Sequence, residues 1–170
     1  MKQAKFFSIL GLFIAGFTIQ TVAQEQVLPE VTVLAHNYKY LKSVNTKDAP
    51  EPVKLLERKA SAYDVKKSEF YEDDYDTYVV TFYLPEGYIL AVYDQNGKLL
   101  RTAERFKNVQ LPQAVRIAVV QNHPKWKIAE DTYLVKYEDA KGGSMIYKLL
   151  LENGNKRLRV KTNEKGEFLK

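Results

Sequence analysis

The stretch YDQNGK, residues 93–98, contains the residue types that begin a calcium-binding loop. Asp94 and Asn96 would supply oxygen ligands, and Gly97 would allow the sharp bend of such a loop. A calcium loop also needs a bidentate Glu at its twelfth position, but counting from Asp94 places Arg105 there. The stretch is therefore predicted to be a tight hairpin turn, in which Gly97 takes the left-handed conformation.

The run FYEDDYD, residues 70–76, combines acidic and aromatic side chains. One interpretation is a weak calcium site or an acidic recognition loop, with Tyr71 and Tyr75 as aromatic anchors. The other is a solvated hairpin tip, whose tyrosines end the adjoining strands. The acidic residues concerned are Glu72, Asp73, Asp74 and Asp76. The corresponding run DAKGGS, residues 139–144, has lost nearly all of this charge, and we favour the hairpin tip.

Catalytic chemistry has few candidate residues in this chain. It contains no cysteine and only two histidines, His36 and His123. His123 precedes a proline, where it is expected to end a helix rather than to activate a nucleophile. No spacing suggests a zinc site, and no glycine-rich phosphate-binding motif occurs. We therefore expect a protein that is not an enzyme, with no catalytic residue, no metal and no cofactor.

Residues 1–23 have the features of a secretory signal peptide. Lys2 and Lys5 precede an apolar stretch at residues 6–19, and Thr21-Val22-Ala23 fits a cleavage site before Gln24. We expect an exported protein, periplasmic or secreted, that meets the membrane only transiently through this peptide. The chain has a net charge of +5, and residues 1–23 hold two lysines and no acidic residue, so the mature chain carries +3. That charge is too mild to indicate a nucleic-acid partner.

The hydrophobic pattern predicts an α+β fold. Helices are expected at residues 50–60 and 112–122. The segment 24–48 is expected to contain an opening strand at 28–43, where Val31, Val33 and Ala35 alternate with polar residues. Further strands are expected at 63–71, 77–84, 87–94, 98–105, 126–138, 144–152, 156–162 and 166–169.

Two parts of the chain resemble each other. Pro52 and Val53 open one predicted helix, as Pro112 and Val115 open the other, and YDQNGK has a counterpart in TNEKGE, residues 162–167. We predict two tandem, degenerate units, 49–108 and 109–170. Each would be one helix followed by a four-stranded antiparallel meander, with the helices packed on one face of the sheet.

A family resemblance rests on the same residues. The order D-x-N-G-K-L, an LP-x-x-V helix, P-x-W-x-I and a Tyr-rich strand pair resembles the PepSY-like domain of exported bacterial proteins. Those domains resemble the beta-lactamase inhibitor protein in fold. The resemblance spans about Ala49 to Lys170 and implies non-catalytic binding or inhibition of an extracytoplasmic partner. It carries over no catalytic residue, and residues 24–48 lie outside it.

Tyrosine placement suggests where a partner binds. Tyr83 and Phe82 point to opposite faces of one predicted strand, and Tyr133 and Tyr137 share one face of another. A sheet with one apolar and one Tyr-rich face suits binding, because Tyr gives contact area at a low entropic cost. The alternatives are that the opening segment covers this face, or that Tyr simply favours strands. The candidate binding residues are Tyr71, Tyr75, Tyr83, Tyr133 and Tyr137.

A basic stripe lies near the C-terminus. Arg157, Arg159 and Lys161 alternate with Leu158 and Val160. These cations would either bind an anionic glycan or lipid head group, or protect an edge strand against aggregation, which is the favoured interpretation. Taken together, the sequence predicts a non-catalytic binding protein whose partner is an envelope or secreted protein such as a hydrolase. The alternative is a protein of the cell envelope that binds a small ligand or a glycan.

Overall fold

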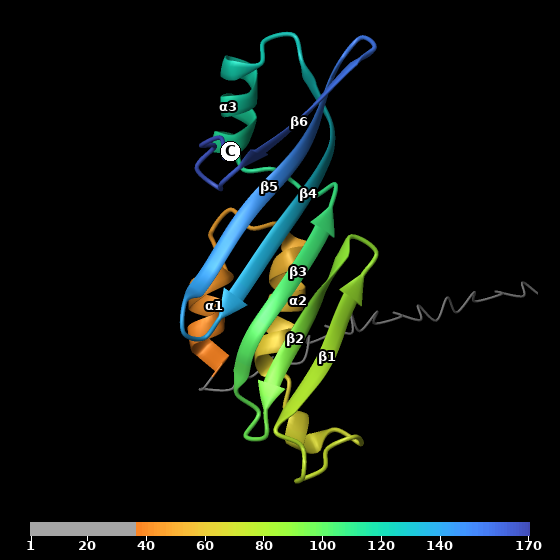
Figure 1. Cartoon of the computed structure of the whole chain (residues 1–170), viewed down its shortest axis with the longest axis vertical. Coiled ribbons are helices and arrows are strands. Elements are labelled where there is room, and N and C mark those ends of the chain that lie inside the picture. Colours follow the sequence, from red (N-terminus) through yellow and green to blue (C-terminus); the bar gives the residue numbers. More distant parts are fainter. Residues whose placement is uncertain (1–36) are drawn as a thin grey trace, which may run out of the picture.

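The computed structural model describes residues 37–170. The predicted signal peptide, His36 and the segment 24–36 lie outside the described residues. Figure 1 shows the order of the elements along the chain. They are α1 (Tyr38–Val44), α2 (Glu51–Ala62), the 3₁₀ turn η2 (Val65–Lys67), β1 (Thr77–Leu84), β2 (Gly87–Asp94), β3 (Leu99–Lys107), α3 (Gln113–Asn122), β4 (Lys127–Glu138), β5 (Gly142–Asn153) and β6 (Lys156–Thr162).

The strands form one antiparallel sheet in the order β1-β2-β3-β4-β5-β6, so that each strand pairs with its neighbour in sequence. The α+β class and these six predicted strands are confirmed, with boundaries shifted by up to two residues. Register irregularities occur between Val92 and Tyr93 and between Ile128 and Glu130. Between these two points the alternation of side chains is continuous, so the pairing register assigns each residue to one face of the sheet.

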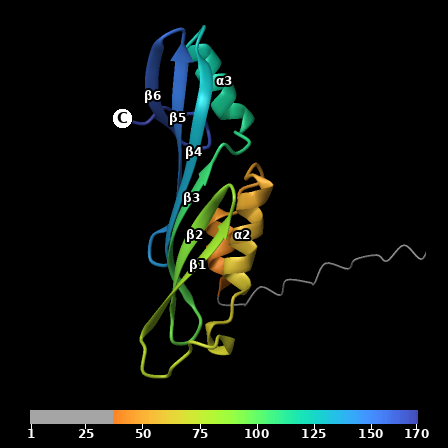
Figure 2. The same cartoon turned by 90° about the vertical axis from the view of Figure 1, so that its right-hand side faces the viewer.

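All three helices of the described chain lie on the same side of the sheet, as Figure 2 shows. On α2, Val53, Leu56 and Ala60 are buried, as their spacing predicts. They pack against a core that includes Tyr93 and Phe106 of the sheet. The opposite face carries no helix of the described chain, and we call it the open face.

Residues 38–44 form helix α1, and the strand predicted for them is wrong. Helical spacing brings Tyr40 and Val44 to one buried side, where the Tyr40 ring meets Tyr137 edge-on at 5.2 Å. The Asn37 side chain fixes the start of the helix, since its amide donates to the carbonyls of Ser61 and Gly97 at 3.2 Å each. Packing of these side chains against the sheet favours the helix, whereas Val31, Val33 and Ala35, whose alternation predicted the strand, lie outside the described residues.

Two further predicted strands are wrong. Residues 63–71 contain the 3₁₀ turn η2, because the Asp64 carboxylate accepts from the backbone N–H of Lys66 at 3.1 Å and turns the chain. Residues 166–169 contribute one isolated bridge, between Phe168 and Thr162. In the described chain each predicted unit thus supplies one long helix and three strands, and all six strands belong to a single sheet.

The two predicted glycine turns share one geometry. Gly97 has φ of +79° and Gly166 has φ of +81°, which confirms the left-handed conformation. The Asp94 carboxylate accepts from the N–H groups of Asn96 and Lys98 at 2.8 and 2.9 Å. The Asn163 side-chain oxygen likewise accepts from residues 165 and 167, at 3.0 Å each. The Asp94 oxygen is thus occupied by the turn itself.

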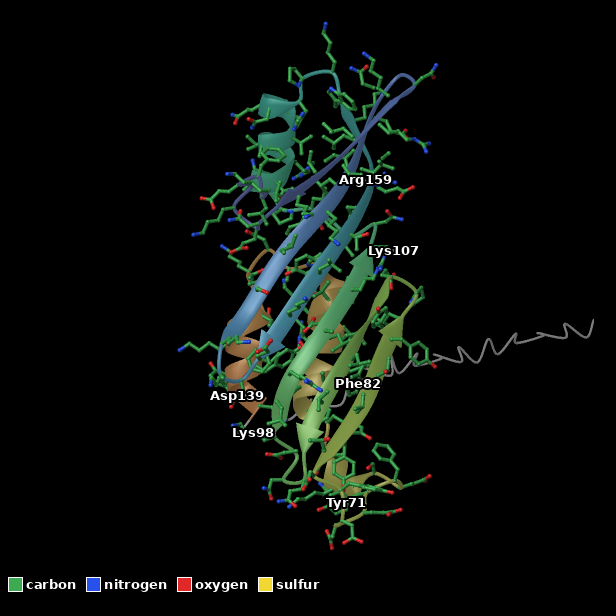
Figure 3. All side chains as sticks on the ribbon, in the orientation of Figure 1. Tyr71, Phe82, Lys98, Lys107, Asp139 and Arg159 are labelled. Carbon is green, nitrogen blue, oxygen red and sulfur yellow. The ribbon has the colours of Figure 1, made fainter. Side chains whose placement is uncertain are left out.

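Asp139 fastens α1 to the lower end of the sheet in Figure 3. Its carboxylate lies 2.9 Å from Lys39 of α1 and 2.6 Å from Lys98, which follows the first glycine turn. Hydrogen bonds from Lys98 and Lys39 lower the pKa of Asp139 to about 2. This pair of contacts holds the β4–β5 turn, the β2–β3 turn and α1 together.

Candidate functional site: the open face of the sheet

A row of side chains crosses the open face over five strands. Tyr83 lies opposite Tyr88, Tyr88 opposite Arg105, Arg105 opposite Leu134, and Leu134 opposite Ile146. Since directly opposite residues on one face have Cβ atoms about 5 Å apart, these side chains form a continuous strip. The strip is aromatic at β1 and β2 and aliphatic at β4 and β5.

Large apolar side chains are unusually exposed at the β1–β2 end of this face. The exposed fraction is 79% for Tyr83 and 61% for Val79, and Tyr88 and Leu90 are also exposed. We call these four residues the aromatic corner. Exposed apolar residues are ordinary when they are scattered singly, but a contiguous group of them marks an interaction site. Beside it, a hollow of about 500 Å³ is lined by Tyr83, Tyr88, Arg105 and Lys107, among others.

Cations dominate the rest of the open face. In the second row Lys107 lies opposite Thr132, Thr132 opposite Lys148, and Lys148 opposite Lys161. No residue of this group is within ion-pair distance of a carboxylate in the described part of the chain. The group, which we call the basic band, comprises Arg105, Lys107, Lys136, Lys148, Arg159 and Lys161.

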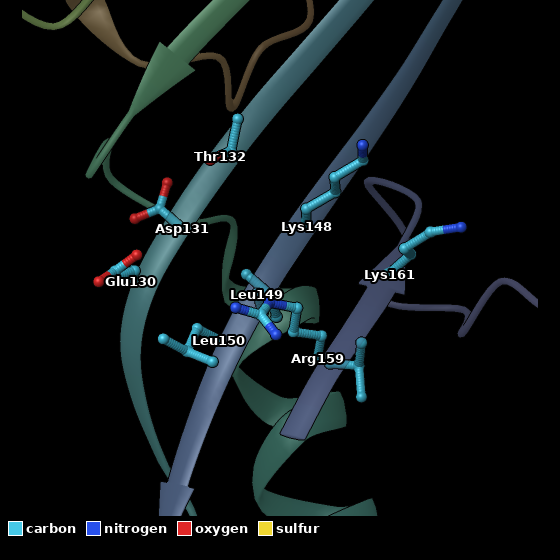
Figure 4. A pocket seen from close by; sticks show the side chains of 9 residues that line it. Glu130, Asp131, Thr132, Lys148, Leu149, Leu150, Arg159 and Lys161 are labelled. Atoms are coloured by element: carbon cyan, nitrogen blue, oxygen red, sulfur yellow. The ribbon is translucent and has the colours of Figure 1, made fainter. Parts of the chain in front are cut away.

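Two hollows lie along the basic band. One, of about 360 Å³, has Leu134 and Ile146 in its wall and Lys136, Lys148 and Lys161 around it. The other, of about 330 Å³, is shown in Figure 4. There Lys148, Arg159 and Lys161 come from β5 and β6, and Glu130 and Asp131 from β4. Both hollows open to solvent. The surroundings of the first suit an anionic group beside an apolar one, whereas the second combines three cations with two carboxylates.

Tyr133 and Tyr137 do not belong to this surface. They share a face, as predicted, but it is the face that the helices cover, and both are about 1% exposed or less. The Tyr133 ring stacks on Tyr147 at 4.5 Å inside the core. The expectation of a Tyr-rich open face is therefore corrected, because most strand tyrosines fill the space under the helices, where large side chains are needed.

Tyr71 and Tyr75 lie in a separate place, at the end of the sheet opposite Tyr83. Both rings contact Tyr78, at 5.3 Å for Tyr71 and 6.2 Å for Tyr75. The Tyr71 hydroxyl donates to the carbonyl of Gln95 at 3.3 Å, and Tyr75 is 52% exposed. Of the five predicted tyrosines, only Tyr83 lies on the open face.

The acidic residues 72–76 are exposed around these rings. Among residues 37–170, no group of three or more His, Cys, Asp or Glu side chains has an arrangement that would hold a metal ion. Tyr78 from β1 donates to the carbonyl of Glu72, and this bond fastens the loop to the sheet. The loop is thus organised by its aromatic residues, with the carboxylates facing solvent.

A buried carboxyl pair lies under α2 and was missed in the sequence. Glu57 and Glu104 are 0% and 3% exposed. Oε1 of Glu104 accepts from the Tyr40 hydroxyl at 2.8 Å and from Thr102 Oγ1 at 2.7 Å. Both oxygens of Glu57 lack a hydrogen-bond partner among the described residues.

Burial, and then the nearby charge of Glu104, raise the pKa of Glu57, while burial raises that of Glu104 against the hydrogen bonds from Thr102 and Tyr40. The pair therefore retains a proton at neutral pH. A signal for Glu57 was present in the sequence, since it lies four residues after Val53 and thus within the buried stripe.

No family model matches the chain. No curated protein matches it either. The chain is similar to the crystal structure of a DUF2874 family protein from Bacteroides ovatus, with 17% identity over 72% of this chain and 86% of that chain and a TM-score of 0.35. It is also similar to that of a BLIP-like protein from Bacteroides fragilis, with 16% identity over 56% of this chain and 74% of that chain and a TM-score of 0.31.

These neighbours fit the α+β architecture, and at such TM-scores they carry no argument about function. Among the described helices, none is long and apolar enough to cross a membrane.

Proposed function

We propose that this chain is an exported, non-catalytic binding protein of the PepSY-like type, and that it engages another envelope or secreted protein, such as a hydrolase, through the open face of its sheet. The observation that carries the proposal is the aromatic corner, where Tyr83 is 79% exposed on a face that no described helix covers. An apolar, aromatic surface of this kind is typical of the centre of a protein interface.

The proposal includes two tandem units, 49–108 and 109–170. Three pairs of features support it. The glycine turns at Gly97 and Gly166 match, and three strands follow each long helix. At the helix starts, the backbone N–H of Lys54 donates to the carbonyl of Pro50, as that of Arg116 donates to the carbonyl of Pro112. Duplication of one helix-and-strand unit accounts for the position of α2 and α3 on the same side of one continuous sheet.

A pull-down tests the proposed function. The mature chain, residues 24–170, is immobilised and exposed to an envelope extract of its own host, and the retained proteins are identified by mass spectrometry. We expect one protein in near-stoichiometric amount, which is lost when Tyr83 and Tyr88 are both changed to Ala. Tyr75→Ala is the matched control, because Tyr75 is exposed but lies at the far end of the sheet. An empty eluate at both low and moderate salt would contradict a stable protein partner.

The second candidate is a protein that binds a small ligand or a glycan. The hollow of about 360 Å³ beside Lys136, Lys148 and Lys161 favours it, since ligand pockets start at about 300 Å³. This function predicts thermal stabilisation by a small anionic compound and no retained protein.

A further inference from the structure

Protection of the sheet edge explains only some of the cations in the basic band. Lys and Arg on an edge strand prevent sheets from pairing edge to edge, and this accounts for Arg159 and Lys161 on β6. It does not account for Lys148 on β5, Lys136 on β4 or Lys107 on β3, because these strands are paired on both sides. The interior part of the basic band therefore needs another explanation.

The arrangement is also electrostatically unfavourable in the isolated chain. Lys148 and Lys161 are direct cross-strand neighbours, and like charges in such positions repel. Three glutamates from β4 and β5 lie on the same face, namely Glu130, Glu138 and Glu152. Glu138 is 2.6 Å from Lys141, and Glu152 is 2.9 Å from Arg157, so these two carboxylates are already engaged outside the basic band.

The basic band adjoins the aromatic corner directly. Arg105 has Tyr88 on one side and Leu134 on the other in the same row. With strands about 4.8 Å apart, that row spans about 19 Å. This length fits within a standard protein interface, whose area of about 800 Å² per partner corresponds to a patch about 28 Å across. A purely anionic chain would contact the cations and leave Tyr83 in water, whereas a carboxylate-rich protein surface that also carries apolar side chains contacts both.

We infer that the basic band receives a carboxylate-rich surface of a protein partner, whose apolar side chains rest on the aromatic corner. This inference rests on the proposed function and specifies the chemistry of the partner. The carboxylates take the place of water around Lys107, Lys148 and Lys161 and relieve the repulsion between neighbouring cations. The apolar contact supplies the affinity, and the charges supply the orientation and the rate of association.

Four probes test the inference on the mature chain: a random copolymer of Glu and Tyr, poly-glutamate of the same length, heparin, and vesicles of phosphatidylglycerol. We expect the Glu–Tyr copolymer to bind most tightly, with an affinity that falls as salt rises. The triple variant Lys148→Glu, Arg159→Glu and Lys161→Glu should lose about tenfold or more in affinity, because like charges across an interface are costly. Tyr83→Ala should abolish the preference for the copolymer over poly-glutamate.

The control variant reverses three cations away from the open face, Lys47, Lys59 and Lys66, and so matches the change in net charge. It should bind the copolymer within about twofold of the unmodified chain if position rather than total charge decides. Equal losses in the two triple variants would overturn the inference, and so would tighter binding of heparin or vesicles than of the copolymer. The pull-down separates this inference from the proposed function. If a protein is retained, is lost when Tyr83 and Tyr88 are changed to Ala, and is still retained by the triple charge-reversal variant, the inference is wrong and the proposed function stands.

Discussion

Glu57 combines complete burial with an ionisable group that has no hydrogen-bond partner among the described residues. The groups that face it are Glu104 from β3, Tyr40 from α1 and Tyr133 from β4, while Lys54 and Arg58 on its own helix act in the opposite direction. Its pKa is raised in the folded chain above the usual value of 4.5, so folding binds a proton that unfolding releases.

The contribution of Glu57 to stability should therefore be fully present below about pH 4.5 and be lost as the pH rises from there towards 9. Each unit by which folding raises a pKa corresponds to about 1.4 kcal/mol over the full titration. Urea unfolding between pH 6 and 9 measures the slope, in a range where ordinary carboxyl groups no longer titrate. Glu57→Gln should reduce the slope and unfold at higher urea concentration than the unmodified chain at pH 9.

Glu51→Gln is the control for this experiment, since Glu51 lies on the same helix with an exposed side chain. Its slope should match that of the unmodified chain. If Glu57→Gln leaves the slope between pH 6 and 9 unchanged, the assignment of a retained proton to the buried pair is wrong.

Tyr83 and Tyr133 offer a second comparison between single residues. Tyr83 is exposed, so Tyr83→Ala should change the free energy of unfolding by no more than about 0.5 kcal/mol. Tyr133 is fully buried and stacked on Tyr147, so Tyr133→Ala should cost about 3–5 kcal/mol. Denaturant titration of both variants checks this, and comparable losses would mean that Tyr83 is part of the core.

Among the elements, α1 depends on a close approach to β5. A Cβ atom at Gly143 would lie 2.5 Å from the carbonyl oxygen of Ser43, so only glycine lets the helix rest there. Gly143→Ala should destabilise the chain by about 1–3 kcal/mol and speed hydrogen exchange in α1. Ser144→Ala, one residue further on the open face, should leave both unchanged. Unaltered exchange in α1 of the Gly143→Ala variant would contradict this account of helix packing.

The elements also show what the sequence can and cannot predict. Strong alternation and flanking turns predicted β1 and β2, and the proline-started pattern predicted α3, because local signals decide these elements. Helix α1 was mistaken for a strand, because the strand predicted from the alternation of Val31, Val33 and Ala35 was extended to residue 43. Only the contact of Tyr40 with Tyr137 and Glu104 reveals the helix.

For the candidate site, alternation grouped Tyr133 with Tyr137 but did not show which face the helices cover. Of the basic band, the sequence singled out only Arg159 and Lys161, in the stripe near the C-terminus, and the rest was missed for a related reason. Lys107, Lys148 and Lys161 come from three strands, and only the pairing register shows that they share one row.

At the level of the whole molecule, the two faces of the sheet differ in composition and exposure. The helix-covered face holds the core, including the buried carboxyl pair, and the open face combines the aromatic corner with the basic band. We propose that a protein partner binds the open face and not the surface of the helices.

The most direct test uses the absence of cysteine, which allows single-cysteine probes without background. Thr81→Cys places a thiol on the open face between Val79 and Tyr83, and Gln121→Cys places one on the exposed side of α3. The rate of maleimide labelling is measured with and without the protein captured in the pull-down. We predict that the captured partner slows labelling at residue 81 and leaves residue 121 unaffected. Protection of residue 121 with residue 81 still fully reactive would contradict the account.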